Sequence, residues 1–421
     1  MPALQAALAQ LDAAQLRRQR LTVEGFGAQG ERSLRTADGT LVDFSSNDYL
    51  GLARHAALAD AMAASARERG AGSGASHLIT GHGAEHAALE AELADFTQRE
   101  RALLFCSGYM ANLAVMGAFA ARGERVLLDR LSHASLIDGA RLSGARLQRY
   151  PHADAAACER LAARRDAPAA LIATDGVFSM DGDLAPVREL ARIAARHEAW
   201  LAVDDAHGLG VLGEGGRGTL ELAGLGAAEV PLLIGTLGKA FGSCGAFVAG
   251  SAQVIEFLLQ KARTYIYTTA LPQPVAAATR AALRLVRAEG WRRAQLAANV
   301  THFRSLARAA GLNLLPSATP IQPLPLGSAA AALSAQAQLT RAGYRVVAIR
   351  PPTVPAAGAR LRISLSATHT QAEIAGLVGA LASLQAQARG GLVGRAALRD
   401  PRSRARPRAA ARLEPQPARL R

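Results

Sequence analysis

The sequence lacks the features that mark membrane and secreted proteins. No stretch approaches the eighteen or so uninterrupted apolar residues of a membrane-spanning helix, and the longest candidate, residues 111–121, is too short. The first twenty residues predict an amphipathic helix that ends in Arg17, Arg18 and Arg20. They show no apolar core followed by a cleavage site, so we expect no secretory signal.

Cysteine is scarce. The chain has three cysteines, Cys106, Cys158 and Cys244, which lie far apart and form no CxxC pair. An odd and sparse count argues against a disulfide framework and favours a reducing compartment, so we expect a cytoplasmic protein.

Positive charge is plentiful but unevenly placed. The net charge is +14 over 421 residues. Residues 389–421 carry ten arginines against Asp400 and Glu414, which is +8 and leaves +6 for the other 388 residues. This segment is rich in arginine, proline and alanine and has no aromatic residue, which predicts a disordered tail. Such a tail binds polyanions through charge alone, and with no recognition motif beside it we expect no specific nucleic-acid partner.

The pattern of apolar residues divides the chain. From about residue 56 to 310, short apolar runs alternate with helical stretches, which predicts an α/β domain with a largely parallel sheet covered on both faces. Past Trp291 a long helix leads to a smaller αβ unit, closed by a helix near residues 371–388. The predicted strands are 103–105, 126–128, 171–174, 200–204, 232–236 and 245–249. The predicted division is an N-terminal helix and hairpin (1–55, with a turn at Asp38-Gly39), a large domain (56–290), a C-terminal α+β domain (291–388) and the basic tail (389–421).

Polar groups collect where the predicted strands end. The segments SGYMAN, SHASLID, DGVFSMDGD, DDAHG and TLGK each follow an apolar run. Open parallel sheets bind ligands at the carboxyl ends of their strands. We therefore expect these five segments to build one site.

The side chains in these segments fit the needs of pyridoxal phosphate. Its aldehyde requires a lysine, which Lys239 supplies, and its ring nitrogen requires a carboxylate, which Asp204 supplies at the end of an apolar strand. Residues 107–109 precede a helical run, so their amides can face a phosphate, and Gly108 permits close approach. Thr236 stands three residues before Lys239, within reach of the same phosphate. His133 follows a strand and offers a flat ring for stacking.

Simpler interpretations exist for each of these residues. Lys239 can be a solvated strand end and Asp204 a structural buried acid. TLGKAF is no phosphate-binding P-loop, because Ala240 stands where that motif has Ser or Thr. A set of three histidines suggests a metal cluster, but no cysteine or carboxylate set completes it, and we expect no metal; these are His77, His82 and His86.

Five motifs together resemble one enzyme family. VDDAHG, DGVFSMDGD, TLGKAFG, FSSNDYLGL and IRPPTVP are similar to segments of the α-oxoamine synthases, fold-type-I pyridoxal-phosphate transferases that condense an amino acid with an acyl thioester and release CO2. The resemblance spans residues 5–388, with the motifs in family order. It implies a seven-stranded, mostly parallel sheet, pyridoxal phosphate as cofactor, and a homodimer.

Within the family, DDAHG and AIRPPTVP are most similar to the branch that serves biotin synthesis. That branch joins L-alanine to a pimeloyl thioester, with CoA or an acyl carrier protein as the carrier. A sister enzyme that uses glycine with acetyl- or succinyl-CoA stays an alternative. A non-catalytic binding protein, with the basic tail on nucleic acid, is a second alternative.

The resemblance also implies roles by position. Lys239 matches the Schiff-base lysine, Asp204 the pyridinium partner, and His133 the stacking ring that also lies near substrate. The remaining cofactor contacts are Gly108, Tyr109, Ser179, His207 and Thr236. The substrate-side positions are Asn47, Thr353, Arg362, which matches the arginine that holds the amino-acid carboxylate, and Arg17, chosen over Arg18 and Arg20.

Overall fold

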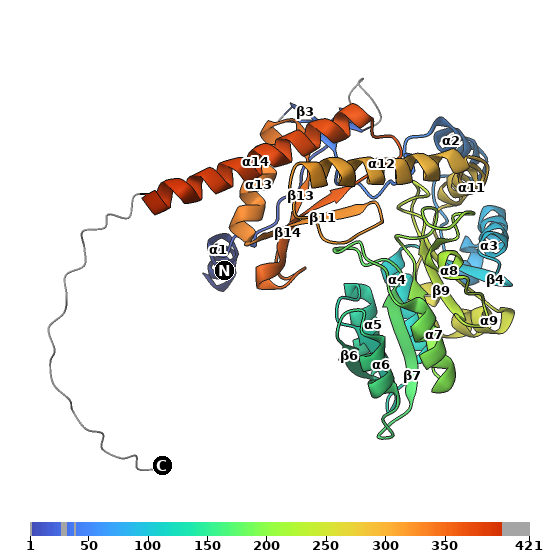
Figure 1. Ribbon diagram of the computed structural model, residues 1–421. Helices are drawn as coiled ribbons and strands as arrows, with labels where there is room; N and C mark the ends of the chain where they lie inside the picture. The colour runs from blue at the N-terminus through green and yellow to red at the C-terminus, as the bar shows by residue number, and fades with distance from the viewer. Residues whose placement is uncertain (1, 27–31, 38, 398–421) are drawn as a thin grey trace, which may run out of the picture.

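The computed structural model describes residues 2–26, 32–37 and 39–397. Its centre is a sheet of seven strands in the order β4-β10-β9-β8-β7-β5-β6 (Figure 1). β10 runs antiparallel to both of its neighbours, and the other pairings are parallel. The strands are β4 (Arg101–Phe105), β5 (Arg125–Asp129), β6 (Arg146–Tyr150), β7 (Ala169–Asp175), β8 (Trp200–Asp204), β9 (Leu232–Thr236) and β10 (Ala246–Gly250). The mostly parallel seven-stranded sheet confirms the predicted fold class.

Helices cover both faces of this sheet, because successive strand residues point to opposite sides. Val126 and Leu128 of β5 belong to one apolar cluster and Leu127 to the other. The first cluster packs under α4 (Gly108–Phe119), α5 (Ala134–Ser143) and α9 (Ala252–Lys261). The second packs under α6 (Ala155–Ala162) and α7 (Val187–Arg196) and extends into the C-terminal unit. Because helices cover both faces of the sheet, its strands must be apolar along nearly their whole length.

Each predicted strand lies within or beside an observed one, whereas β6 was not predicted. Its sequence, RLQRY, is mostly polar and only Tyr150 is fully buried. β6 pairs with β5 alone at the edge of the sheet. One open edge and partial exposure remove the apolar signal on which the strand predictions depend.

The C-terminal unit is built on a second sheet. β11 (Ile321–Gly327), β14 (Ala359–Ser364) and β13 (Val347–Ile349) form three antiparallel strands in the order β11-β14-β13. The long helices α12 (Gly290–Ala309), α13 (Ala329–Arg341) and α14 (Gln371–Ala397) lie around it (Figure 1). α14 runs past residue 388, so the backbone of residues 389–397 is helical and not disordered as predicted, whereas the domain boundary at 388 stays a prediction. The rest of the predicted tail, residues 398–421, lies outside the described residues.

The N-terminal segment joins this C-terminal unit. β2 (Ser33–Thr36) and β3 (Gly39–Asp43) form the predicted hairpin, whose turn residue Asp38 lies outside the described residues. β3 pairs in parallel with β12 (Tyr344–Arg345), some 300 residues later. The first helix, α1 (Pro2–Ala13), ends before the arginines at 17, 18 and 20, so the predicted helix was too long. Gln15 has φ of 56°, a left-handed conformation that a helix cannot continue through.

The remaining elements connect these parts. They are β1 (Gly25–Phe26), α2 (Ala56–Arg69), the π-helix η1 (His77–Gly81), α3 (Ala84–Phe96), α8 (Gly218–Ala223), α10 (Arg263–Ile266), α11 (Gln273–Ala288) and the 3-10 turn η2 (Ala356–Gly358). Among the helices that the structure describes, none combines the length and apolar character needed to span a bilayer.

Candidate active site

Polar side chains from four strand ends lie at one edge of the central sheet, among them the predicted site residues His133, Asp204 and Lys239. Asp175 and Asp204 are the last residues of β7 and β8 and lie opposite each other in the strand pairing. Asp204 is in turn paired with Ile234 of β9, two residues before that strand ends. His133 follows β5 and Lys239 follows β9. The parallel arrangement thus gathers side chains that are up to 106 residues apart in the sequence, from His133 to Lys239.

The Lys239 amine lies against the ring of His207. Its Nζ is 2.8 Å from His207 Nε2. Burial lowers the pKa of Lys239 to about 8, although the nearby carboxylates of Asp204 and Asp175 act in the opposite sense. Burial also holds the pKa of His207 well below its usual range, so this ring is neutral at physiological pH. At pH 7 roughly a tenth of Lys239 is therefore an uncharged, nucleophilic amine, far more than for a lysine with the ordinary pKa of about 10.4.

Asp204 is buried and held by a short chain of hydrogen bonds that ends at His133. The amide Nδ2 of Asn112 donates to Asp204 Oδ2 at 2.7 Å and to Ser135 Oγ at 2.8 Å. Ser135 Oγ is 2.7 Å from His133 Nδ1. The backbone N–H of Ala206 donates to the second carboxylate oxygen of Asp204 at 3.1 Å. These hydrogen bonds fix the orientation of the Asp204 carboxylate relative to the His133 ring. The His133 side chain itself is exposed.

Asp175 differs from Asp204 in its surroundings. Burial raises its pKa well above the usual range, and the charge of Asp204 raises it further. The backbone N–H of His133 donates to Asp175 Oδ2 at 2.9 Å. Two adjacent buried carboxylates do not both ionise readily, so Asp175 carries the proton of the pair.

Ser179 lies in the loop that follows β7, at the junction with the C-terminal unit. Arg362 of β14 donates from Nε to the Ser179 carbonyl at 2.6 Å and from Nη2 to Asn47 Oδ1 at 3.1 Å. Its Nη1 donates to Ser364 Oγ at 2.8 Å. Arg360 pairs with Asp181 of the same loop. The structure therefore brings Arg362 and Asn47, the predicted substrate-side residues, together with the backbone of Ser179, a predicted cofactor contact.

His152 forms hydrogen bonds with the other side of the loop that contains Ser179. Its Nδ1 is 3.0 Å from Asp129 Oδ1 and its Nε2 is 2.7 Å from Asp183 Oδ2. Hydrogen bonding to Asp129, then to Asp183, raises the pKa of His152 to about 10. The imidazolium is thus a charged bridge between the end of β5 and the Ser179 loop.

We expect His152→Gln to lower the free energy of unfolding by roughly 1.5–3 kcal/mol at pH 6, the usual range for hydrogen bonds to charged groups. The folded-state pKa lies above that of an unfolded histidine, near 6.5. The stabilisation is therefore complete below about pH 6.5 and is lost as the pH rises through about 10. Urea unfolding at pH 6, 8 and 10 measures this, with His302→Gln on α12 as the control. A difference from wild type that stays constant over this range would contradict the bridge.

The N-terminus of α4 follows β4 and lies at the same edge of the sheet as Lys239. Ser107 caps α4 by accepting a hydrogen bond from the Met110 N–H at 3.3 Å, so the first amides of this twelve-residue helix stay available. A Cβ placed on Gly108 would meet nothing within 4 Å, and one on Gly238 nothing closer than 3.6 Å. Thr236 and Phe105, which precedes this helix, are both paired with Ala246 of the intervening strand β10, and the Thr236 Oγ1 accepts from the Gly238 N–H at 3.3 Å. Open space at a helix N-terminus suits a phosphate group.

Together these groups fit pyridoxal phosphate. The amine of Lys239 and the carboxylate of Asp204 are close enough for the charge of each to act on the other and on His133. The open N-terminus of α4 at Gly108 and the Thr236 hydroxyl are groups of the kind that bind a phosphate. Tyr109 is 44% exposed, and its hydroxyl donates to Asp138 at 2.7 Å.

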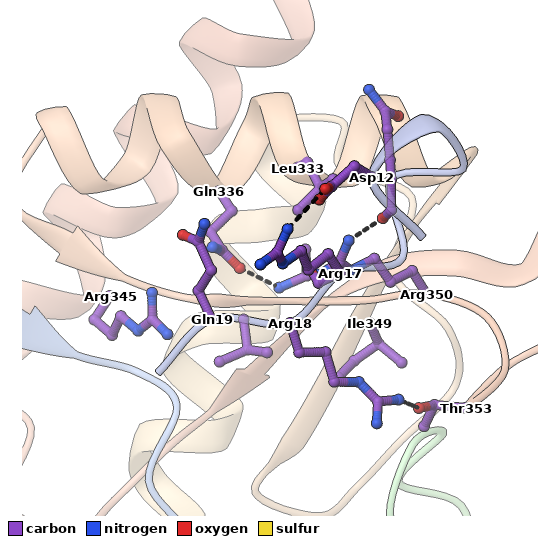
Figure 2. A pocket seen from close by; sticks show the side chains of 13 residues that line it. Asp12, Arg17, Arg18, Gln19, Leu333, Gln336, Arg345, Ile349, Arg350 and Thr353 are labelled. Carbon is purple, nitrogen blue, oxygen red and sulfur yellow. Dashed lines mark hydrogen bonds and ion pairs between the residues drawn. The ribbon is translucent and has the colours of Figure 1, made fainter. Parts of the chain in front are cut away.

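The N-terminal arginines line a separate outer cavity of about 650 Å³ (Figure 2). Arg18 donates to Thr353 Oγ1 at 3.2 Å. Arg17, the arginine chosen from the sequence, pairs instead with Asp12 at 2.7 Å. Arg350 donates to the Arg17 carbonyl at 2.9 Å and holds this segment in place. The structure thus brings Arg18, rather than Arg17, into contact with Thr353, although both arginines line the cavity.

The three histidines near η1 also come together. One ring nitrogen of each lies within 4.8 Å of the others, and His77 Nδ1 is 3.0 Å from His82 Nδ1. Both nitrogens of His86 are engaged by the backbone, Nδ1 with the Gly83 N–H and Nε2 with the Leu271 carbonyl. Burial lowers the pKa of His77 to about 3, so the His77 ring is uncharged at neutral pH. That the chain uses no metal stays a prediction.

Two residues of the site were missed from the sequence. Tyr49 is fully buried and its hydroxyl lies 2.7 Å from His207 Nδ1. Asn112 carries the hydrogen bonds between Asp204 and Ser135. A signal existed for Asn112, because it is a polar residue within the otherwise apolar face of α4. No sequence signal marked Tyr49 as a site residue, apart from its position in the segment FSSNDYLGL.

Comparison with known proteins identifies the family to which the chain belongs. The family described as "Aminotransferase class I and II" matches residues 39–381. The 8-amino-7-oxononanoate synthase of Methylococcus capsulatus is 60% identical over 341 residues, 81% of this chain and 88% of the relative. That of Pseudomonas putida is 52% identical over 387 residues, 91% of this chain and 97% of the relative.

Solved structures agree with these sequences. The 8-amino-7-oxononanoate synthase of Francisella tularensis has a TM-score of 0.74 at 32% identity and covers 84% of this chain and 99% of its own. A serine palmitoyltransferase of S. paucimobilis, solved with PLP bound, has a TM-score of 0.86 at 28% identity and covers 92% and 98%. The cofactor of this chain is accordingly pyridoxal phosphate. The chain belongs to the class I and II aminotransferase family and, within it, to the pyridoxal-phosphate acyltransferases known as 8-amino-7-oxononanoate synthases.

Proposed function

We propose that the chain condenses L-alanine with a pimeloyl thioester, and releases 8-amino-7-oxononanoate, CO2 and the free thiol carrier, as a step of biotin synthesis. The observation that supports this most is that Lys239, Asp204 and His133 lie at the carboxyl ends of strands in one sheet, at the edge where α4 begins with the open Gly108. Pyridoxal phosphate, when bound, supplies a sink for the electrons left on the α-carbon of the amino acid.

The proposed holders of the cofactor are the residues of this edge. Lys239 binds the aldehyde, Asp204 faces the ring nitrogen, and His133 stacks on the ring. Ser179 and His207 serve the phenolic oxygen. The remaining contacts, to the phosphate and the ring, come from Gly108, Tyr109 and Thr236.

The proposed chemical steps rest on three side chains. Lys239, with a pKa of about 8, takes the α-proton of alanine at its Nζ, since a base poised near the working pH is the most effective. Arg362 orients the alanine carboxylate through the N–H groups of its buried guanidinium that the protein does not use, and Asn47, which accepts from Arg362 through its Oδ1, contacts substrate through its amide nitrogen. His133 stands at the exposed side of the site, where it can donate to the acyl oxygen of the thioester. Thr353, Arg17 and Arg18 face the outer cavity and receive the acyl substrate there.

The finer proposals concern the carrier, the assembly and the compartment. Both pimeloyl-CoA and a pimeloyl acyl carrier protein are proposed carriers. A homodimer is supported by exposed apolar side chains on two neighbouring segments beside the site: Leu78, Ile79 and Tyr267 are 46%, 75% and 71% exposed. The three free cysteines suit a cytoplasmic location. The proposed division of the chain keeps a large domain at 56–290 and a smaller one at 291–388.

A substrate-pairing assay tests the function. Purified protein with pyridoxal phosphate is offered L-alanine, glycine or L-serine, each with pimeloyl-CoA, a pimeloyl acyl carrier protein or acetyl-CoA. We expect alanine with a pimeloyl thioester to exceed glycine in kcat/KM by roughly 10- to 200-fold, the usual discrimination by one methyl group. Mass spectrometry of the product measures this. Faster turnover of glycine with acetyl-CoA would replace the proposal with a sister activity.

A further inference from the structure

A continuous chain of hydrogen bonds joins the Lys239 amine to Arg362 through three side chains. Lys239 Nζ lies 2.8 Å from His207 Nε2, and His207 Nδ1 lies 2.7 Å from the hydroxyl of Tyr49. That hydroxyl is 3.2 Å from Asn47 Oδ1, which also accepts from Arg362 Nη2 at 3.1 Å. The chain therefore runs from the C-terminal unit to the end of β9.

The donors and acceptors in this chain have a fixed order. A guanidinium has only donors, so the Asn47 atom that faces Arg362 is the amide oxygen. The Tyr49 hydroxyl must then donate its single proton to this oxygen. Its own oxygen is left to accept from the Nδ1–H of His207. A neutral imidazole with its proton on Nδ1 has a bare Nε2, which faces Lys239.

We propose that Tyr49 is a positioning residue for the free amine, before the cofactor binds: it holds His207 in the Nδ1–H tautomer, so that the bare Nε2 accepts a hydrogen bond from Lys239. Tyr49 thereby orients the amine although it does not touch it. The inference deepens the proposed function, because it concerns the residue on which that function depends. It rests on geometry alone, however, and its test does not require turnover.

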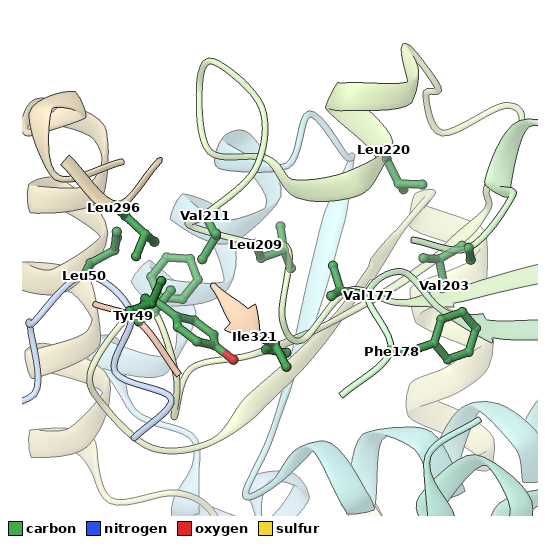
Figure 3. Close-up of a cluster of buried hydrophobic side chains, with 14 of the residues drawn as sticks. Tyr49, Leu50, Val177, Phe178, Val203, Leu209, Val211, Leu220, Leu296 and Ile321 are labelled. Carbon is green, nitrogen blue, oxygen red and sulfur yellow. The ribbon is translucent and has the colours of Figure 1, made fainter. Parts of the chain in front are cut away.

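Packing makes Tyr49 suited to this role. The ring is fully buried and lies in an apolar cluster near Leu50, Leu296 and Val211 (Figure 3). Its backbone is fixed too, since the Ala367 N–H donates to the Tyr49 carbonyl at 2.8 Å. Burial raises the pKa of the phenol, so it keeps its proton at every physiological pH. The hydroxyl therefore cannot swing away from His207, and it cannot act as an anion.

The principal test removes only this hydroxyl. In cofactor-free Tyr49→Phe protein, Nδ1 of His207 loses its acceptor, and we expect the proton to move to Nε2. Nitrogen NMR of the His207 ring reports the tautomer directly. Nε2–H then donates to the uncharged amine, which favours that form and lowers the apparent pKa of Lys239 by about one unit. The chain has two lysines, so the pH dependence of amine labelling, read by mass spectrometry, gives this value with Lys261 as the internal reference.

Two further variants make the result decisive. Tyr150→Phe removes the hydroxyl of an equally buried tyrosine at the end of β6 and should change neither readout. Asn47→Leu keeps the Tyr49 hydroxyl but removes its acceptor, so the proton turns toward His207 and the same change of tautomer is expected. Retention of the Nδ1–H tautomer and of the lysine titration in Tyr49→Phe would overturn the inference. A wild-type protein that makes no 8-amino-7-oxononanoate would instead overturn the proposed function and leave these readouts unaffected.

Discussion

Replacement of Lys239 with alanine is expected to lower kcat by on the order of 10⁴-fold, the upper range for loss of a general base. It is also expected to abolish the visible absorbance of bound cofactor. One amine is proposed for two tasks, the covalent attachment of the aldehyde and the removal of the α-proton, so both are lost together. Steady-state kinetics and an absorbance spectrum after dialysis against pyridoxal phosphate measure the two effects.

The only other lysine in the sequence provides the matched control. Lys261 is exposed at the end of α9, and Lys261→Ala should keep both the activity and the absorbance. Circular dichroism of Lys239→Ala should match wild type, because the side chain is only partly buried and no core contact is removed. Full activity in a correctly folded Lys239→Ala protein would refute the assigned site.

The sequence predicted those parts of the fold and site that depend on local patterns. The strand at Trp200–Asp204 was predicted with its observed bounds, because an apolar run is followed at once by DDAHG. The end of that strand then placed Asp204 at the ligand-binding edge of the sheet. The long helix after Trp291 was likewise predicted to within one residue at each end.

Parts that depend on distant contacts could not be predicted. Nothing in the hairpin at residues 33–43 indicates that it pairs with Tyr344 and Arg345. The contact of Tyr49 with His207 spans 158 residues, and no spacing rule reaches so far. The different contacts of the N-terminal arginines could not be predicted either, because Arg18 donates to Thr353, 335 residues later, whereas Arg17 pairs with Asp12.

The two acidic residues that end β7 and β8 allow a sharp test of charge at the site. Asp204 is proposed to meet the ring nitrogen, whereas Asp175 is held protonated by burial and by the charge of Asp204. Asparagine has the shape of aspartate but no charge. Asp204→Asn should therefore lower kcat by roughly 10²–10³-fold, as loss of a preorganised electrostatic partner does, and weaken cofactor binding.

Asp175→Asn is the control, with the same substitution at the paired position of the neighbouring strand. Its amide oxygen can still accept from the His133 N–H, which donates to Asp175 Oδ2 at 2.9 Å. Because Asp175 is uncharged already, we expect kcat within about threefold of wild type, in line with the small cost of an exchange that keeps a hydrogen bond. Cofactor titration followed by fluorescence, together with kcat for both variants, measures the difference. Equal losses in the two variants would show that the site responds to packing at the strand ends, and not to the charge that Asp204 places beside Lys239.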